Sequence, residues 1–136
     1  MSTLQVATIK SLDSGNPGFV NSSGTEVGLL VKKWINFNGQ GTVSIRDDFG
    51  ISSVTDNGTG TYTLNFDGNM SNADYCVTFT GGGGGHNGFA TAFGAGDSST
   101  SFFFTGSCQF NFRGADGSGG GNRDPHTVAA IITGDN

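Results

Sequence analysis

The chain has 136 residues and a net charge of −5, with six lysine and arginine residues against eleven acidic ones. A protein that neutralises phosphates needs a basic patch, so this balance excludes nucleic acid as the main partner. Twenty-five glycines beside two prolines exclude a collagen-like chain. No apolar run approaches the ~18 residues of a membrane span, so we expect no membrane insertion.

The N-terminal segment divides into a short alternating stretch and a longer polar one. Leu4 and Val6 alternate with polar residues over residues 3–9, and serine, asparagine and glycine then dominate residues 11–28. The pattern of a signal peptide, a charged start followed by an apolar core, is absent from this segment. The polar stretch is typical of a linker or an extended arm.

We therefore divide the chain into an N-terminal arm or attachment segment, residues 1–28, and a head domain, residues 29–136. Apolar residues of such an arm can add a strand to a neighbouring sheet or intertwine between subunits. For an arm that makes such contacts, as the resemblance described below implies, the candidate residues are Leu4, Val6 and Ile9.

Strand patterns fill the head domain, whereas no window shows the apolar periodicity of a helix. In the first of these strands Val31, Ile35 and Phe37 share one face and Trp34 occupies the other. In chain order, the predicted strands cover residues 29–37, 42–46, 62–66, 75–79, 89–93, 101–105, 108–113 and 126–133.

Asn-Gly pairs and one irregular stretch separate these strands. Asn38-Gly39 is expected to supply the positive φ angles of a tight hairpin, and Asn57-Gly58 marks the next turn. Phe49, Ile51 and Val54 do not keep a strict period of two, which predicts a bulge or bend between residues 48 and 53.

Eight to ten short strands joined by hairpin turns predict an all-β fold. A parallel arrangement would need crossover helices, which the sequence lacks. We expect an antiparallel β-sandwich, jelly-roll-like, preceded by the extended N-terminal arm.

The two glycine-rich segments do not carry the signatures of known ligand loops. The run at residues 81–85 is followed by His86 and Asn87 rather than by the Lys-Ser or Lys-Thr and helix of a phosphate loop. The segment at residues 114–124 lacks both the ligand spacing and the flanking helices of an EF-hand. A flexible or close-packed surface loop is the plainer interpretation, and ligand contact at a loop tip is the alternative.

Metal-binding groups are few and far apart. His86 and His126 are widely separated, and no Cys or His pair has the spacing of metal ligands. Cys76 and Cys108 are interpreted as two small buried apolar residues, with a disulfide left open. The sequence predicts no metal and no cofactor.

An enzyme is not expected. Asp47 and Asp48 are the only adjacent acidic pair, and neighbours on a strand point to opposite faces, which favours a solvated turn over paired catalytic carboxylates. No nucleophile with an adjacent base can be identified.

For the alternative of ligand contact, the candidates are exposed side chains of the two glycine-rich loops and their flanks. A flat aromatic ring and a few amides are the groups that a sugar site uses. The candidate ligand-binding residues are His86, Asn87, Phe89, Asn122 and Arg123.

Phe102, Phe103 and Phe104 are consecutive, so at least one of them faces away from a core reached by the others. An outward phenylalanine would be buried at a subunit interface. The alternative is a strand that the same chain covers on both faces, and the sequence leaves both open.

The stretch WINFNGQGTVSIRDDFGISSVTDNGTGTYTLNF carries a family resemblance. Residues 34–46 and 52–66 resemble a W-V-N-F-N-G-T-G-T-V-x-I-R hairpin followed by S-S-I-T-D-N-G-x-G-x-Y-T-V-N-F, a pattern of tailed-bacteriophage proteins, especially marine and cyanobacterial phages. The opening STLQVATI and the closing VAAIITGDN are similar as well, whereas residues 81–125 are not covered.

That family is similar to tail-fibre, head-fibre and other virion surface proteins. The resemblance implies a small all-β head, a homotrimer, an N-terminal segment that attaches to other virion proteins, and no catalytic residues. It also implies a virion location after assembly in the host cytoplasm.

Three functions follow for testing. The first is a non-enzymatic tail or fibre head that recognises a host surface glycan. The second is a capsid decoration or cement protein, or a short head fibre, that stabilises the shell. The third is a depolymerising enzyme, which would need an acidic pair across a groove.

Overall fold

The computed structural model describes residues 19–28, 31–83, 89–92, 102–114 and 121–134. Within them every regular element is a strand. The strands are β1 (Phe19–Val20), β2 (Glu26–Gly28), β3 (Lys33–Asn38), β4 (Ser44–Phe49), β5 (Ile51–Asp56), β6 (Thr61–Phe66), β7 (Cys76–Gly82), β8 (Phe89–Ala92), β9 (Phe103–Phe104), β10 (Ser107–Gly114) and β11 (Thr127–Thr133). The described residues contain no helix long and apolar enough to cross a membrane.

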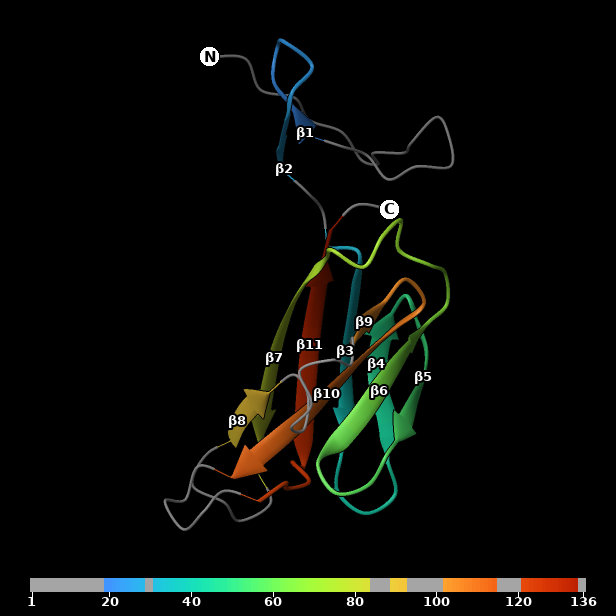
Figure 1. The fold of residues 1–136 in the computed structure, drawn as a ribbon, viewed down its shortest axis with the longest axis vertical. Helices are drawn as coiled ribbons and strands as arrows, with labels where there is room; N and C mark the ends of the chain where they lie inside the picture. The colour runs from blue at the N-terminus through green and yellow to red at the C-terminus, as the bar shows by residue number, and fades with distance from the viewer. Residues whose placement is uncertain (1–18, 29–30, 84–88, 93–101, 115–120, 135–136) are drawn as a thin grey trace.

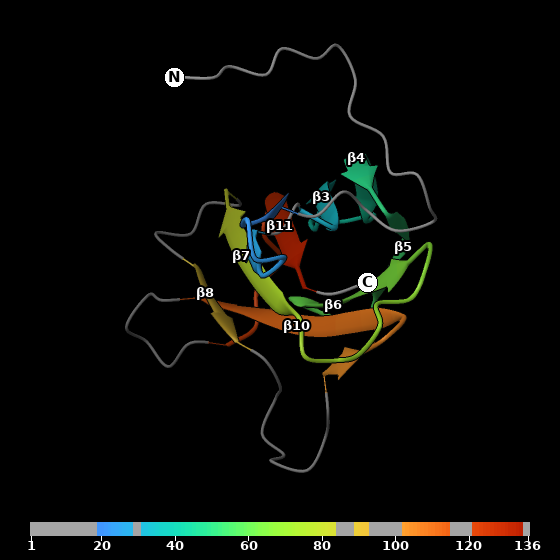
Figure 2. The same cartoon turned by 90° about the horizontal axis from the view of Figure 1, so that it is seen from above.

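Two antiparallel sheets pack face to face (Figures 1 and 2). The first has the strand order β4-β3-β11-β7; the second has the order β5-β6-β10-β8, with β9 also paired to β10. The chain passes between the sheets after β4, β6, β7 and β10. These nine strands confirm the predicted all-β sandwich, while β1 and β2 form a separate two-stranded sheet. Leu4, Val6 and Ile9 of the expected arm lie outside the described residues.

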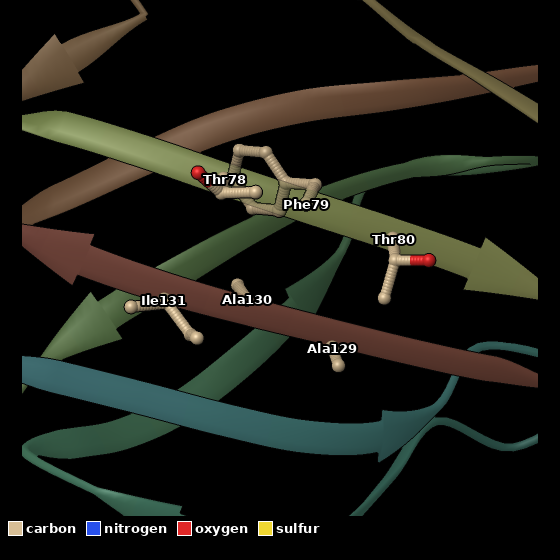
Figure 3. A pocket seen from close by; sticks show the side chains of 6 residues that line it. All are labelled: Thr78, Phe79, Thr80, Ala129, Ala130 and Ile131. Atoms are coloured by element: carbon tan, nitrogen blue, oxygen red, sulfur yellow. The ribbon is translucent and has the colours of Figure 1, made fainter.

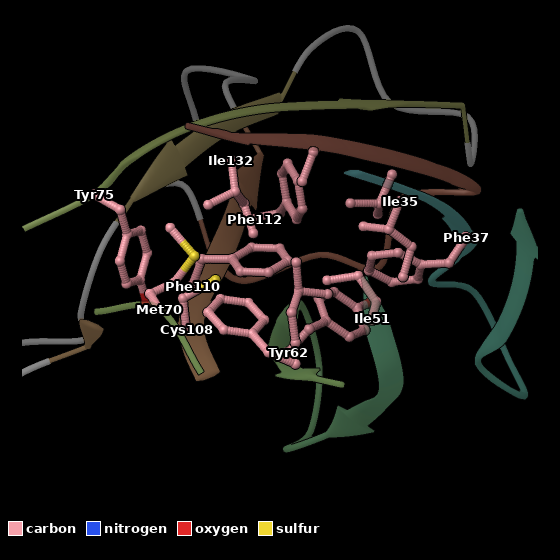
Figure 4. Close-up of a cluster of buried hydrophobic side chains, with 14 residues drawn as sticks. Ile35, Phe37, Ile51, Tyr62, Met70, Tyr75, Cys108, Phe110, Phe112 and Ile132 are labelled. Atoms are coloured by element: carbon pink, nitrogen blue, oxygen red, sulfur yellow. The ribbon is translucent and has the colours of Figure 1, made fainter. Parts of the chain in front are cut away.

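The core lies between the sheets and is rich in aromatic rings (Figure 4). Alternate residues of β6, β10 and β11 point inward, as their period of two predicts. Phe79 of β7 stacks on Phe110 of β10 with ring centroids 3.9 Å apart, so the stack joins the two sheets. The buried apolar residues are Ile35, Phe37, Ile51, Tyr62, Leu64, Phe66, Met70, Tyr75, Cys108, Phe110, Phe112, Val128, Ala130 and Ile132.

The inward face of β3 differs from the prediction at its start. The strand begins at Lys33, which is buried beside Ile35, whereas Val31 precedes the strand and is 44% exposed. The Lys33 ammonium lies 3.3 Å from Asp67 Oδ1 and 5.2 Å from the centroid of the Phe66 ring. A lysine can occupy this core position because its methylene stem is apolar and its charged end reaches the surface.

The first Asn-Gly turn also differs from the prediction. No residue with positive φ occurs at Asn38 or Gly39; Gly41 instead has φ +67°. The Asn38 amide donates to the carbonyl oxygens of Gln40 and Thr42, which holds a longer loop. Gly39 is needed for space, because a Cβ there would lie 2.7 Å from the hydroxyl oxygen of Tyr62.

The expected irregularity after residue 48 is present. Gly50 adopts φ +76° and leads the chain from β4 in one sheet to β5 in the other. The pairing of β5 with β6 then shifts by one residue between Ile51 and Ser53. The change of sheet explains why the apolar residues lose their period of two at this point.

Candidate functional site

The outer face of the β4-β3-β11-β7 sheet carries a row of side chains that the strand register places side by side. Trp34 points outward because its neighbours Lys33 and Ile35 are buried. It pairs with Phe49 on one side and with Ile131 on the other, and Ile131 pairs in turn with Thr78. We call Phe49, Trp34, Ile131 and Thr78 the aromatic row.

The aromatic row is accessible. Phe49 is 56% exposed and Ile131 is 49% exposed, while Trp34 is half-buried between them. Large apolar side chains that gather on one face are more informative than single exposed ones, because such a patch marks a binding surface.

The next row along the same face is polar. Asn36 pairs with Asp47 of β4 and with Ala129 of β11, and Ala129 pairs with Thr80 of β7. Amide, carboxylate and hydroxyl groups therefore lie two residues along the strands from the aromatic row, on the same face of the sheet.

Arg46 stabilises this polar row. Asn36 pairs with Asp47 and Phe37 pairs with Ile45, so Arg46 is the extra residue of a bulge in β4. Its guanidinium donates to Asn36 Oδ1 at 3.1 Å, Phe37 O at 3.0 Å, Thr127 Oγ1 at 3.4 Å and His126 O at 2.7 Å. These bonds tie the edge strand β4 to β3 and to the start of β11.

A shallow groove of about 90 Å³ opens beside the aromatic row, between β7 and β11 (Figure 3). Its walls carry the methyl groups of Thr78, Thr80, Ala129 and Ile131, and the strand residues Phe79 and Ala130 complete its lining. No ionisable side chain lines it, so the groove is suited to binding an apolar group rather than to proton transfer.

Three of the five predicted ligand-binding residues lie at the C-terminal end of β10. Phe89 pairs with Gly114, and Asn122 forms a bridge with Arg113. Arg123 follows directly in the chain. His86 and Asn87 lie outside the described residues.

Asn122 and Arg123 are half-buried and contact the scaffold. The Asn122 amide donates to Thr61 Oγ1 at 3.4 Å, and the Arg123 backbone N–H donates to Phe112 O at 3.0 Å. A Cβ on Gly60 would lie 2.6 Å from the carbonyl oxygen of Arg123, so this segment packs closely against the β5–β6 turn. These contacts give both residues a structural part in holding the turn.

The three consecutive phenylalanines differ in their exposure. Phe103 is half-buried and its ring meets the Tyr75 ring edge to face, with centroids 5.2 Å apart. Phe102 is half-buried too, whereas Phe104 is 49% exposed. One ring of the three therefore faces solvent, and a subunit interface at Phe104 stays a prediction.

The two cysteines have different environments. Cys108 is buried in the core, but Cys76 is exposed at the start of β7, so the interpretation of both as buried is wrong for Cys76. Its side chain points outward because the next residue, Val77, packs against the core and neighbours on a strand face opposite sides. Both thiols are free, and burial raises the pKa of Cys108 to about 12.

The acidic pair of β4 is divided between the two faces of the sheet. Asp47 is exposed and pairs with outward-facing Asn36, whereas Asp48 is half-buried and pairs with Ile35. Their carboxylates accept hydrogen bonds from local backbone N–H groups of Asp48 and Ile51. Among the described residues, no group of three or more His, Cys, Asp or Glu side chains could hold a metal ion.

The aromatic row was not identified from the sequence as a site. Trp34 was correctly placed on the opposite face from Ile35, and this outward tryptophan was the available signal. Its partners Phe49 and Ile131 come from distant parts of the chain and meet it only through the strand register. No family model, curated protein or solved structure matches the chain.

Proposed function

We propose that the chain is a non-enzymatic surface protein of a tailed-bacteriophage virion, whose β-sandwich head binds a host surface glycan. The pairing of outward Trp34 with exposed Phe49, beside the polar row of Asn36 and Asp47, supports this best. Sugar rings present C–H groups that pack on aromatic faces and hydroxyls that bond to amides and carboxylates. The virion assignment depends on the resemblance of residues 34–46 and 52–66 to the phage pattern.

The groove beside the row suggests which glycans fit. Sites for small molecules usually measure roughly 300–1,000 Å³, so a groove of about 90 Å³ accommodates a small substituent rather than a whole sugar ring. Its methyl-lined walls favour an apolar end. We therefore propose an acetylated or methylated sugar, with its ring over the aromatic row and its substituent between Thr78 and Ile131.

The charge of the protein also favours a neutral glycan. The chain carries a net charge of −5, which repels polyanionic glycans. Arg46, a cation that reaches across the outer face, is bonded to four acceptors. A neutral N-acetylated glycan suits this surface better than a sulfated or uronic one.

Tryptophan fluorescence tests this proposal directly, because Trp34 is the only Trp in the chain and lies in the proposed site. Fluorescence would be titrated with N-acetylglucosamine oligomers and, as a matched control, glucose oligomers of the same length. We expect the emission to shift with the acetylated series, and Phe49→Ser or Ile131→Ser to weaken binding roughly tenfold or more. Phe104→Ser, which removes an equally exposed apolar side chain elsewhere, should leave the titration unchanged.

If the N-acetylglucosamine oligomers do not change the Trp34 fluorescence, a wider panel of host envelope polysaccharides would be titrated in the same way. Absence of a response to every glycan, together with undiminished adsorption of phage carrying Ile131→Ser, would reject the glycan proposal.

The second candidate is decoration or cementing of the capsid, or a short head fibre. The apolar character of Phe49 and Ile131 favours it, since both side chains would also be buried well against a shell protein. Gold-labelled antibody on intact virions separates the two. Label at the tail supports host recognition, whereas label over the head, with Phe49→Ser releasing the protein from capsids, supports decoration. In both cases we propose a homotrimer bound to other virion proteins and assembled in the host cytoplasm.

A further inference from the structure

The dipeptide Asn-Gly occurs in two turns of the sandwich whose surroundings differ. Asn38-Gly39 follows β3, and Asn57-Gly58 lies between β5 and β6. In such a pair the glycine backbone nitrogen can attack the amide carbon of the asparagine side chain, since no glycine Cβ obstructs the approach. The two atoms must come within ~3–3.5 Å of each other to react. The freedom of each pair to reach that geometry therefore decides whether it reacts.

Asn38-Gly39 is held away from the reactive geometry. The Asn38 amide nitrogen donates to the carbonyl oxygens of Gln40 at 2.7 Å and Thr42 at 3.3 Å, and Asn38 Oδ1 accepts the Gln40 N–H at 3.4 Å. The Gly39 N–H donates to Pro125 O at 3.1 Å. Gly39 is also buried, with no space for even a Cβ. The Asn38 side chain therefore cannot turn over the Gly39 nitrogen unless this loop detaches from the sandwich.

Asn57-Gly58 is open to solvent instead. Both residues are exposed, and a Cβ on Gly58 meets nothing within 4 Å. The Asn57 amide donates to Thr63 Oγ1 at 2.8 Å, and the Gly58 N–H donates to Asp56 Oδ1 at 2.9 Å. Both acceptors belong to surface side chains whose place water can take. These bonds can therefore open without any change in the packing of the two sheets.

We propose that Asn57 is a site of spontaneous deamidation and that the fold protects Asn38 from the same reaction. The Gly58 nitrogen forms a bond to Asn57 Cγ, and its proton passes through solvent to the departing side-chain nitrogen, which leaves as ammonia. Water then opens the resulting cyclic imide at either carbonyl, which leaves aspartate or isoaspartate at position 57. No group is oxidised or reduced, and water is the co-reactant. The reaction is independent of the proposed glycan binding.

The products should weaken the turn between β5 and β6. Aspartate has no amide to donate to Thr63 Oγ1, and it places a second carboxylate beside Asp56. Isoaspartate adds its Cβ to the backbone of a turn that two bonds hold, from Asn57 N–H to Thr61 O at 2.9 Å and from Thr61 N–H to Gly58 O at 2.8 Å. The chain should therefore lose stability as it ages.

The test follows both pairs in one sample by mass spectrometry of tryptic peptides, after the folded full-length chain has aged at mildly alkaline pH. Trypsin cleaves after lysine and arginine, so Asn38 is in the peptide of residues 34–46 and Asn57 in that of residues 47–113. Fragment ions distinguish Asn57 from Asn87, whose Asn-Gly pair lies outside the described residues. Asn38 should deamidate roughly tenfold or more slowly than Asn57, because its several hydrogen bonds must open first.

The same chain aged in urea is the matched control, because both pairs are then free of the fold. Asn38 and Asn57 should react there at similar rates, and Asn57 should keep most of its rate in the folded chain. Equal rates in the folded chain would overturn the proposal, as would an Asn57 that reacts only in urea. A ratio in urea equal to that in the folded chain would also overturn it, since neighbouring sequence would then explain the difference.

Asn57→Gln tests the effect on the turn. Its amide carbon lies one bond farther along the side chain, so attack by the Gly58 nitrogen is much slower. With a reducing agent present, the aged parent should unfold at a lower urea concentration than the fresh parent, whereas aged and fresh Asn57→Gln should unfold alike. An equal loss of stability in both chains would reject the weakening of the β5–β6 turn.

Discussion

The hydroxyl oxygen of Tyr62 lies 2.7 Å from the carbonyl oxygen of Gly39, and this contact joins the two sheets of the sandwich. Tyr62 belongs to β6, whereas Gly39 follows β3. The same hydroxyl lies 2.9 Å from Asp124 Oδ1, which also accepts the backbone N–H of Gly60. One side chain thus connects the loop after β3, the turn before β6 and the segment before β11.

Tyr62→Phe should lower the free energy of unfolding by about 1–3 kcal/mol, because it leaves the Gly39 carbonyl and the Asp124 carboxylate without their shared donor. Urea unfolding measures the loss. Asp124→Asn is the matched variant, since an amide oxygen can still accept the Tyr62 proton, and it should cost less. Equal losses would mean that the negative charge of Asp124, rather than its oxygen, is what Tyr62 requires.

Adjacent glycines in β7 offer a second comparison. A Cβ on Gly81 would lie 2.6 Å from Cε1 of the Phe112 ring, whereas a Cβ on Gly82 meets nothing within 4 Å. Gly81→Ala should therefore destabilise the sandwich by about 1–3 kcal/mol through overpacking. Gly82→Ala should leave the melting temperature almost unchanged or raise it slightly. The prediction fails if the two variants melt together.

Much of the sandwich could be predicted because a period of two directly reports which face is buried. Tyr62, Leu64 and Phe66 were placed correctly in this way, and all three are buried. The same reasoning failed at Lys33, since a pattern of polar and apolar residues cannot show that a lysine stem is buried while its ammonium reaches Asp67. It failed also at Asn38-Gly39, where Gly39 is needed for the space beneath Tyr62 and not for its φ angle.

The candidate site was less predictable because it depends on strand order. Trp34, Phe49 and Ile131 meet only because β11 pairs with β3 and β3 pairs with β4. Strand alternation gives the direction of each side chain but not its neighbour on the next strand. The residues assigned from the glycine-rich loops were chosen for their expected exposure, yet Asn122 and Arg123 are half-buried against the β5–β6 turn and β10.

The two thiols should differ sharply in reactivity. Cys76 is exposed and Cys108 is buried, and the thiolate is the reactive form. A colorimetric disulfide reagent at neutral pH should modify one thiol per folded chain and both in urea. Cys76→Ser should abolish the reaction of the folded chain, while Cys108→Ala should leave it intact. Rapid modification of both thiols in the folded chain would contradict the buried position of Cys108.

Stability should fall at alkaline pH. Burial raises the pKa of Cys108 from its ordinary 9.0 to about 12, and burial together with the Asp124 contact raises that of Tyr62 above its ordinary 10.0. The folded chain keeps protons that the unfolded chain releases, so these groups stabilise it fully below pH 9 and progressively less above it. Each group contributes a slope of at most about 1.4 kcal/mol per pH unit.

Urea unfolding from pH 7 to 11, with a reducing agent present, measures this slope. Cys108→Ala should be less stable than the parent at pH 7 because it leaves a cavity. Between pH 9 and 10, however, its stability should fall less steeply than that of the parent. The Cys108 thiol has a pKa of 9.0 when unfolded and about 12 when folded, so it contributes from pH 9 upward, whereas Tyr62 contributes only above its ordinary pKa of 10.0. Phe104→Ser, which removes an exposed side chain without a titratable group, serves as the control and should keep the parent slope. A parent chain whose stability is flat to pH 10.5 would show that the buried thiol ionises as easily as a free one.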